Sequence, residues 1–221
     1  MSENIVIFGS SGHAKVIVDI VEKEGKFKIV GFLDPKLKIG DKIFGYSFIG
    51  RDQDLPSLMN RYSIHGGIIA IGDNQMRFEL SKKIENLVPN FNFIRAVHPR
   101  AIMAREVGIG EGTVVMAGAV INPYCSIGRF CILNTQSSFD HDSTMADFSS
   151  LAPGVVTGGN VQIKEFSAIG IGAILLDGIR IGEHTVIGAG ATVVKDIDAY
   201  CIAYGTPAGV KKKRKAGEKY L

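Results

Sequence analysis

The feature that most limits the fold of this chain is a six-residue repeat that runs without a gap from Val97 to Asp198. The segment divides into seventeen hexads, and sixteen of the seventeen first positions are apolar, with Thr157 as the exception. The fifth positions are all small or β-branched. A period of six fits neither the 3.6-residue turn of an α-helix nor the two-residue alternation of a long strand. It fits short strands joined by turns, with the first and fifth positions pointing inward, and therefore predicts a parallel β-helix.

A coil of this kind has simple physical requirements. No single hexad can bury its own apolar face, so the coil is stable only as an array in which each rung contacts its neighbours. Glycine is expected to supply turn conformations that a Cβ would disfavour. Cys125 and Cys131 occupy the small fifth position, where cysteine behaves as a small apolar side chain, and Cys201 follows the repeat. We therefore expect neither a disulfide nor a metal site from the three cysteines.

The first 95 residues follow a different pattern, in which strands alternate with helices. Apolar runs predict strands at 4–9, 28–34, 66–72 and 91–97, and helical spacing predicts helices at 13–25, 55–64 and 73–87. In the first helix, Val16, Ile20 and Val21 are expected to face the sheet, and Gly25 to end the helix. Such alternation predicts a small parallel, Rossmann-like α/β sheet. We therefore expect an α/β domain over 1–95, a β-helix over 96–198, and an extension with a basic tail over 199–221.

Ligands of parallel α/β sheets bind beyond the carboxyl ends of the strands, where three predicted loops should meet. The loop after the first strand, G-S-S-G-H, lacks a full G-x-G-x-x-G motif, so it predicts a phosphate or nucleotide site rather than a nicotinamide site. A tight turn without a ligand is the alternative. The candidate binding residues in the three loops are Ser11, Gly12 and His13; Asp34 and Pro35; and Gly72, Asp73 and Asn74.

Several motifs together carry a resemblance to a known family. They are the hexads, "IFGSSGHAKV" at 7–16, "NTQSSFDHD" at 134–142 and "GTPA" at 205–208. With them, essentially the whole chain resembles the hexapeptide-repeat acyltransferases, and within these the bacterial nucleotide-sugar N-acetyltransferases that include the bacillosamine and perosamine enzymes, kin of the sialic acid O-acetyltransferases. The resemblance implies a left-handed β-helix and a homotrimer with active sites between subunits. It also implies that acetyl-CoA lies in the groove between coils and that the first domain holds a nucleotide sugar.

The resemblance gives a role to the pair His141 and Asp142, because this branch uses a histidine followed by an acid as its catalytic base. His141 is the third residue of its hexad, outside the two core positions. An amine must lose a proton to attack a thioester, an imidazole can accept that proton, and an adjoining carboxylate fixes the imidazole tautomer. A backbone amide would stabilise the oxyanion. A surface histidine without a catalytic role is the alternative.

Other candidates have weaker claims. Asn134 matches a family asparagine near the reacting groups, although a ladder of stacked amides would explain it equally. Asp140 could orient the imidazole or bind the sugar amine, or be a solvated turn residue. His184 is expected to be exposed at a turn, and His98 to be structural. Serine occupies position 150, where some relatives carry a second active-site histidine.

The late, glycine-rich rungs are the expected cofactor site, because glycine allows a ligand to approach the backbone closely. The basic run Lys211–Lys215 could add charge for the 3′-phosphate of coenzyme A, although a solvated charge run is the simpler interpretation. The candidate cofactor-binding residues are Gly170, Gly172, Ala173, Gly188, Ala189 and Pro207.

Composition narrows the remaining choices. The net charge is +3, of which the basic run contributes five positive charges, so the rest of the chain carries −2 and a nucleic-acid surface is not expected. No apolar run approaches 18 residues and no leader is recognisable, so we expect a cytoplasmic protein without membrane insertion.

These features predict a function. We expect an acetyl-CoA-dependent N-acetyltransferase, without a metal, that modifies the 4-amino group of a nucleotide-linked dideoxy amino sugar. The substrate would be GDP-perosamine, a UDP-bacillosamine precursor or a dTDP-4-amino sugar, used for O-antigen or other surface-glycan synthesis. A sialic acid O-acetyltransferase and a noncatalytic nucleotide-sugar-binding scaffold are the alternatives.

Overall fold

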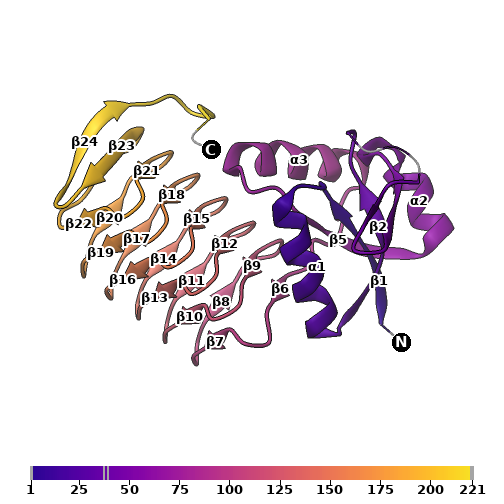
Figure 1. The fold of residues 1–221 in the computed structure, drawn as a ribbon, viewed down its shortest axis with the longest axis horizontal. Coiled ribbons are helices and arrows are strands. Elements are labelled where there is room, and N and C mark those ends of the chain that lie inside the picture. Colours follow the sequence, from indigo (N-terminus) through magenta and orange to yellow (C-terminus); the bar gives the residue numbers. More distant parts are fainter. Residues whose placement is uncertain (1, 37, 39, 220–221) are drawn as a thin grey trace. The chain divides into compact units, whose positions relative to one another are not determined.

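The computed structural model describes residues 2–36, 38 and 40–219, and the chain divides into two compact units. The first unit comprises Met1–Gly72 and Met76–Pro99, and the second comprises Asp73–Gln75 and Arg100–Leu221. Figure 1 shows helices in the first unit and a stack of short strands in the second. None of the helices in the described part of the chain combines the length and apolar character that crossing a bilayer requires.

The first unit is built on one sheet with the strand order β3-β4-β2-β1-β5. Strands β1, β2, β4 and β5 are parallel, and β3 pairs antiparallel with β4. This α/β unit was predicted from the sequence, but its β3–β4 hairpin was not. The elements are β1 (Glu3–Phe8), α1 (Gly12–Glu24), β2 (Phe27–Leu33), β3 (Lys42–Ile43), β4 (Tyr46–Gly50), a short 3₁₀ turn (Asp52–Asp54), α2 (Leu55–Tyr62), β5 (Ile64–Ile69), α3 (Asn74–Leu87) and β6 (Ala96–Val97).

Two details of this unit differ from the sequence prediction. Helix α1 ends at Gly25 in a left-handed conformation, as predicted, but its buried face is formed by Ala14, Ile17, Val18, Ile20 and Val21. Val16 is instead 39% exposed, because the helical stripe is centred one position further along. The predicted strand at 91–97 is reduced to a single bridge at Phe93 and the two residues of β6, although Phe91 and Phe93 are buried on either side of the exposed Asn92.

The second unit is the predicted β-helix, with three parallel sheets formed by two-residue strands. Partners within a sheet are 18 residues apart, so three hexads make one turn. The first sheet contains β7 (Ile102–Met103), β10 (Val120–Ile121), β13 (Ser138–Phe139), β16 (Val156–Thr157), β19 (Ile174–Leu175) and β22 (Thr192–Val193). The second contains β8 (Gly108–Ile109), β11 (Ser126–Ile127), β14 (Thr144–Met145), β17 (Gln162–Ile163) and β20 (Arg180–Ile181). The third contains β9 (Val114–Val115), β12 (Ile132–Leu133), β15 (Ser150–Leu151), β18 (Ala168–Ile169) and β21 (Val186–Ile187), and continues into β23 (Cys201–Gly205) and β24 (Ala208–Lys213).

The interior of the coil confirms the predicted inward positions. First and fifth positions are buried from Thr113 onward, whereas Met103, in the first rung, is 41% exposed. Small hydroxyls at the fifth position also accept hydrogen bonds from the next rung, as Ser143 Oγ does from Val161 N at 3.0 Å and Thr113 Oγ1 from Cys131 N at 2.9 Å. A small side chain at this position therefore both fits the corner and satisfies a buried amide. All three cysteines are buried and free.

The turns of the coil rely less on glycine than expected. The fourth hexad position adopts a left-handed conformation along the coil, yet Tyr124, Gln136 and Asp142 occupy it as well as glycines. At one corner the fourth position carries stacked rings, with centroids 4.9, 5.4 and 4.5 Å apart along the series Phe130, Phe148, Phe166 and His184. Tyr200, beyond the repeat, continues the stack at 5.2 Å from His184. The expectation that His184 is exposed is therefore wrong, since its ring lies between two aromatic rings, and burial lowers its pKa.

The carboxyl-terminal segment is not a free basic tail. Strands β23 and β24 pair antiparallel at the end of the third sheet, and Lys211, Lys212 and Lys213 belong to β24 with exposed side chains. Arg214 is buried, and its Nη1 donates to the carbonyl of His184 at 2.8 Å. The basic run that was expected to be a solvated tail is thus part of the β23–β24 hairpin. This hairpin extends the third sheet of the coil, since β23 pairs with β21.

Candidate active site

The geometry of the β-helix places His141 at the turn that follows β13 in the first sheet. Its Nδ1 lies 2.8 Å from Asp142 Oδ2, and the two side chains are 50% and 53% exposed. A carboxylate only accepts hydrogen bonds, so Nδ1 carries the proton that is donated and Nε2 is left as the basic nitrogen. Asp142 takes a left-handed φ of 56°, which aspartate tolerates better than most residues, and the turn thereby brings adjacent side chains together.

The neighbours of His141 favour its charged form. The hydrogen bond to Asp142 is the largest cause that raises the pKa of His141, and the charges of Asp140, Asp142 and Asp177 act in the same direction. Asp140 itself does not contact the imidazole through a hydrogen bond. Its Oδ1 accepts from Asn122 Nδ2 at 2.5 Å and from the backbone N–H of His141 at 2.8 Å.

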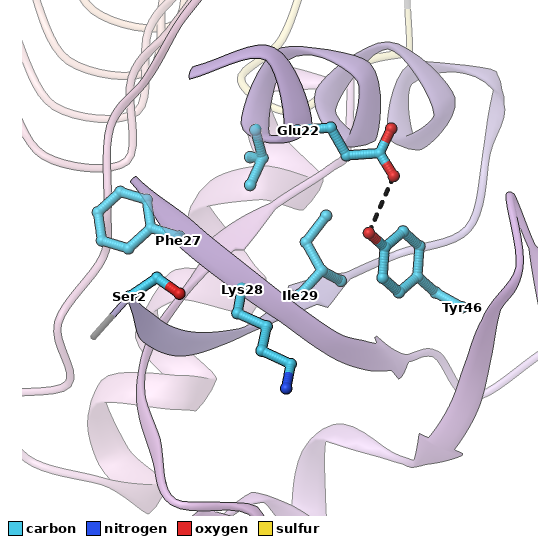
Figure 2. A pocket seen from close by; sticks show the side chains of 7 residues that line it. Ser2, Glu22, Phe27, Lys28, Ile29 and Tyr46 are labelled. Carbon is cyan, nitrogen blue, oxygen red and sulfur yellow. Dashed lines mark hydrogen bonds between the residues drawn. The ribbon is translucent and has the colours of Figure 1, made fainter. Parts of the chain in front are cut away.

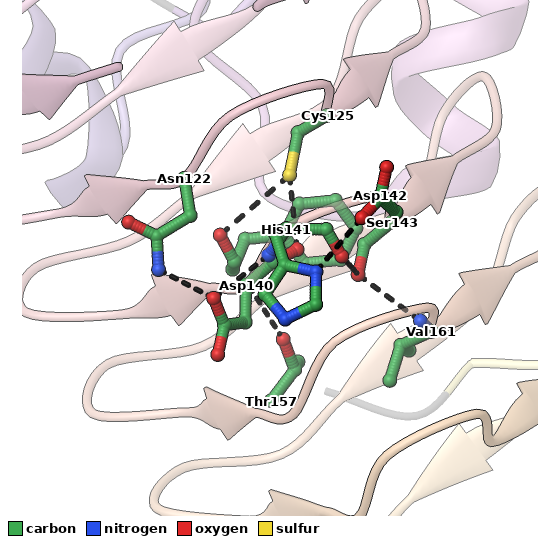
Figure 3. Close-up of polar contacts among 9 residues, drawn as sticks. Asn122, Cys125, Asp140, His141, Asp142, Ser143, Thr157 and Val161 are labelled. Carbon is green, nitrogen blue, oxygen red and sulfur yellow. Dashed lines mark hydrogen bonds and ion pairs between the residues drawn. The ribbon is translucent and has the colours of Figure 1, made fainter.

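The turn that carries His141 is held by a small polar network (Figure 3). The backbone N–H of Asp140 donates to Thr157 Oγ1 at 3.0 Å, which gives a reason for the one polar first position in the repeat. Bonds to His141 N and Asn122 lower the pKa of Asp140, because they stabilise its carboxylate. Asp140 is therefore a turn-stabilising residue, the simpler of its two sequence interpretations. Thr157, which the repeat marked only as an irregularity, also holds this turn.

Gly159 borders His141 on the next rung, and the sequence did not mark it as a site residue. A Cβ built on Gly159 would lie 2.6 Å from His141 Cε1 and 2.7 Å from His141 Nε2. The adjacent amides of Gly158 and Asn160 donate to backbone carbonyls, whereas the N–H of Gly159 donates to no backbone carbonyl in the described part of the chain. An unoccupied amide beside a basic nitrogen could bind an anionic oxygen.

The predicted loops of the first unit do meet at the carboxyl ends of adjacent strands. Ser10 Oγ donates to Asp34 Oδ2 at 2.6 Å, and Lys36 N donates to Asp34 Oδ1 at 2.7 Å, so Asp34 joins the first two loops and shapes the turn that contains Pro35. Ser11 Oγ donates to the carbonyl of Ala70 at 3.5 Å, which links the first loop to the end of β5.

His13 and Arg77 stand out in this region. Burial and then the charge of Arg77 lower the pKa of His13 to about 4, so the imidazole is neutral at physiological pH. His13 Nε2 is buried and has no hydrogen-bond partner among the described residues. Arg77, which the sequence did not mark, is buried and donates from Nη1 to the carbonyls of Ile71 and Gly72 at 2.9 and 3.0 Å. Arg77 therefore fixes the third loop.

Other predicted residues lie elsewhere. Residues Asp73–Gln75 group with the second unit, where buried Asn74 donates from Nδ2 to the carbonyl of Ser167 at 3.1 Å. Asn134 follows β12 in the third sheet, not the sheet of His141, and its Oδ1 accepts from Thr135 N. The equivalent positions on adjacent rungs are Met116 and Ala152, so no ladder of amides forms.

The expected cofactor residues are of three kinds. A Cβ on Gly170 or Gly188 would lie within 2.7 Å of atoms of a neighbouring rung or strand, so both glycines serve close packing rather than an open groove. Ala173 is a buried fifth position. The exposed candidates are Gly172, Ala189 and Pro207, with Gly172 in a left-handed turn that has open space beside it.

An open pocket of about 360 Å³ in the first unit lies at the amino ends of β1 and β2 (Figure 2). Tyr46 Oη donates to Glu22 Oε1 at 2.9 Å across it, and burial followed by this bond raises the pKa of Tyr46. The pocket is at the opposite ends of the strands from the predicted loops. Across residues 2–36, 38 and 40–219, no cluster of three His, Cys, Asp or Glu side chains is arranged to hold a metal ion.

Comparisons with known proteins agree with this architecture. Residues 4–84 match the PglD N-terminal domain, and residues 160–195 match the bacterial transferase hexapeptide (six repeats). The chain is 32% identical over 117 residues to UDP-N-acetylbacillosamine N-acetyltransferase of Bacillus subtilis (strain 168), and this match spans 52% of each protein.

Two solved structures match over a larger share. One is a histidine-to-alanine variant of GDP-perosamine N-acetyltransferase from Caulobacter crescentus in complex with CoA and GDP-perosamine, with 32% identity, a TM-score of 0.89 and coverage of 95% of this chain and 97% of that one. The other is the acetyltransferase domain of PglB from Neisseria gonorrhoeae with acetyl coenzyme A, with 30% identity, a TM-score of 0.88 and coverage of 96% and 100%. With its α/β unit, left-handed β-helix and near-complete coverage of these relatives, the chain belongs to the hexapeptide-repeat N-acetyltransferases of nucleotide-linked amino sugars.

Proposed function

We propose that this protein transfers an acetyl group from acetyl-CoA to the 4-amino group of a nucleotide-linked dideoxy sugar, with His141 as general base. The observation that carries the proposal is the His141–Asp142 pair, whose free Nε2 faces the space beside Gly159. The ligands named for the two structural relatives, CoA with GDP-perosamine and acetyl coenzyme A, support the choice of substrates. The product would be used for O-antigen or another surface glycan.

The proposed reaction is a direct acyl transfer. The amine nitrogen attacks the thioester carbonyl carbon and forms the C–N bond, while His141 Nε2 takes a proton from that nitrogen. Asp142 holds the imidazole through Nδ1 and stabilises the imidazolium that forms. The tetrahedral intermediate then collapses, the C–S bond breaks, and the imidazolium returns its proton to the thiolate of coenzyme A.

We assign the oxyanion of that intermediate to the backbone N–H of Gly159. Gly159 borders His141 Nε2, and its amide donates to no backbone carbonyl in the described part of the chain. A hydrogen bond aimed at developing charge in such a site contributes about 2.7–4 kcal/mol in comparable enzymes. Because the donor is a backbone group, a side-chain substitution at position 159 would act through crowding rather than through loss of the donor.

The nucleotide sugar would bind to the first unit. Helix α1 has no acidic residue in its first turn, and its N-cap residue Ser11 makes no side-chain capping bond. Ala14 N donates to the carbonyl of Ser11, so the amides of Gly12 and His13 are the ones that we assign to a phosphate. Asp34 and Arg77 hold the loops on either side. A neutral His13 adds no charge to this region but can donate or accept a hydrogen bond.

We further propose that the protein is a homotrimer with active sites between subunits. The outward face of the first sheet carries exposed aliphatic side chains, and a patch of this kind is typical of an interaction surface. The turn with His141 follows β13 in the same sheet, which would place the base at the interface. Acetyl-CoA and nucleotide sugars are cytoplasmic metabolites, so we place the reaction in the cytoplasm. The exposed side chains are Ile102, Val156, Ile174 and Leu176.

The test is release of coenzyme A by the purified protein with acetyl-CoA and GDP-perosamine, a UDP-linked 4-amino precursor of bacillosamine, or a dTDP-linked 4-amino sugar. We expect turnover with at least one of them, and a fall in turnover of about 10²–10⁴-fold in His141→Ala, the range for loss of a general base. Release of coenzyme A with sialic acid alone would indicate an O-acetyltransferase. No release with any acceptor would overturn the proposed activity, and an active His141→Ala would overturn the role of the base.

A further inference from the structure

A second acidic residue faces His141 across Gly159. Residues 141, 159 and 177 occupy the third hexad position on three successive rungs, one coil turn apart. Backbone bonds tie these turns together, with Asn160 N donating to the carbonyl of His141 and Gly178 N to the carbonyl of Gly159, both at 2.9 Å. His141, Gly159 and Asp177 therefore form one column along a corner of the coil.

The glycine in the middle of this column allows both side chains to approach its Cα closely. A Cβ on Gly159 would lie 2.7 Å from His141 Nε2 and 3.0 Å from Asp177 Oδ1. Both atoms therefore lie close to the same point beside Gly159. Nδ1 of His141 is occupied by Asp142, so Nε2, the nitrogen near Gly159, is the one able to accept a proton.

Two hydrogen-bond acceptors close to one point, His141 Nε2 and Asp177 Oδ1, suit a primary amine. A primary amine has two N–H bonds and one lone pair, so it can donate to His141 Nε2 and to Asp177 Oδ1 while its lone pair remains directed at the thioester. A hydroxyl has only one hydrogen and cannot satisfy both acceptors. The amide product also has only one N–H, and therefore loses one of the two bonds.

We propose that Asp177 is a substrate-binding and specificity-determining residue, which accepts the second N–H of the acceptor amine opposite His141 and so favours primary amines over hydroxyls. Asp177 takes no proton in the reaction; it keeps a hydrogen bond to the nitrogen while His141 removes the other hydrogen. This inference rests on the proposed N-acetyltransferase activity and assigns a residue for its choice of acceptor.

The test compares ligands that differ in the number of hydrogens on the reacting atom. Calorimetry measures binding of GDP-perosamine, its N-acetylated product and the corresponding 4-hydroxy sugar to the parent protein, Asp177→Ala and Asp177→Asn. We expect Asp177→Ala to weaken binding of the amine by about 10- to 100-fold, the range for loss of a hydrogen bond to a charged group, and to leave the other two ligands within about 3-fold. Asp177→Asn, which retains an acceptor oxygen, should recover part of the affinity.

The matched control is Glu165→Ala, since Glu165 is an exposed acid at the third hexad position of another corner. It should change none of the three affinities. Equal weakening of all three ligands by Asp177→Ala, or no weakening of the amine, would overturn the inference. Coenzyme A release by the parent protein separates this result from the proposed function. If the parent turns over GDP-perosamine but Asp177→Ala binds the amine as tightly as the parent does, the proposed activity stands and the proposed role of Asp177 is wrong. If the parent is inactive with GDP-perosamine, the same binding comparison is made with the UDP- and dTDP-linked amines, each with its N-acetylated product and its 4-hydroxy analogue. A parent that is inactive with all three amines overturns both proposals.

Discussion

Replacement of Gly159 by alanine gives a sharp test of the site, because the methyl group would enter the space beside His141. The new carbon would lie 2.6 Å from His141 Cε1, whereas non-bonded carbons prefer about 3.5–4.0 Å, so the imidazole must move by about 1 Å. A displacement of about 1 Å of a catalytic group costs on the order of 10²-fold in rate. Gly159 has no left-handed φ, so alanine fits the backbone, and the half-exposed imidazole has room to swing outward. We therefore expect kcat to fall about 100-fold without unfolding.

The assay is coenzyme A release under saturating acetyl-CoA, together with thermal unfolding of each variant. Gly108→Ala is the matched control, since a Cβ there meets no atom within 4 Å, and it should keep parental activity and stability. A double variant tests whether the methyl group acts through the imidazole. If it does, Gly159→Ala should cost little in a protein that already carries His141→Ala. Activity of Gly159→Ala within about 3-fold of the parent would refute the placement of the reacting groups.

Three further predictions concern ionisation and the end of the coil. In Asp142→Asn the pKa of His141 should fall, because the hydrogen bond that raises this pKa is weakened. Since the base acts in its neutral form, the acidic limb of the kcat–pH profile should shift to lower pH, and an unshifted limb would contradict this prediction. The pKa of His13 is about 4 in the folded protein against 6.5 in the unfolded chain, so the free energy of unfolding should fall as pH drops from 6.5 to 4. His13→Gln should remove about 2 kcal/mol of that loss, measured by urea titrations at pH 7 and 4.5. An unchanged pH dependence would exclude this contribution of His13. Arg214→Ala should lower the unfolding free energy by about 1–3 kcal/mol, because buried carbonyls lose their donor, whereas the exposed Lys215→Ala should not; equal unfolding midpoints would argue against this role.

The repeat allowed the coil and the turn that carries His141 to be predicted, because periodic burial is a local property that each hexad repeats. Position three of the hexad is outside the core, and this alone placed His141 on the surface at a turn. The pairing with Asp142 followed from adjacency, since two neighbouring side chains at a turn can meet without any tertiary constraint. The resemblance supplied their roles.

The role of Asp177 could not be predicted in this way. It is 36 residues from His141, and only the stacking of three rungs brings both beside the missing side chain of Gly159. The aromatic column with His184 has the same origin, because Phe148, Phe166 and His184 are one full coil turn apart and look like isolated turn residues in the sequence. Arg214 likewise appeared to belong to a solvated basic run until the hairpin buried it.

The amino-acid sequence by itself thus determined the two architectures and the adjacency of His141 and Asp142, since hydrophobic period and adjacent residues act over one hexad or one helix turn. The role of base that we propose for His141 came from the family resemblance. Tertiary structure decided which residues surround that base, which nitrogen of His141 is free, and how far burial changes the ionisation of His13. The physical reason is that electrostatics and shape in a site depend on distances between rungs and loops that are far apart in the chain. A period of six predicts that rungs stack, but only the stacked rungs bring His141 and Asp177 together beside Gly159.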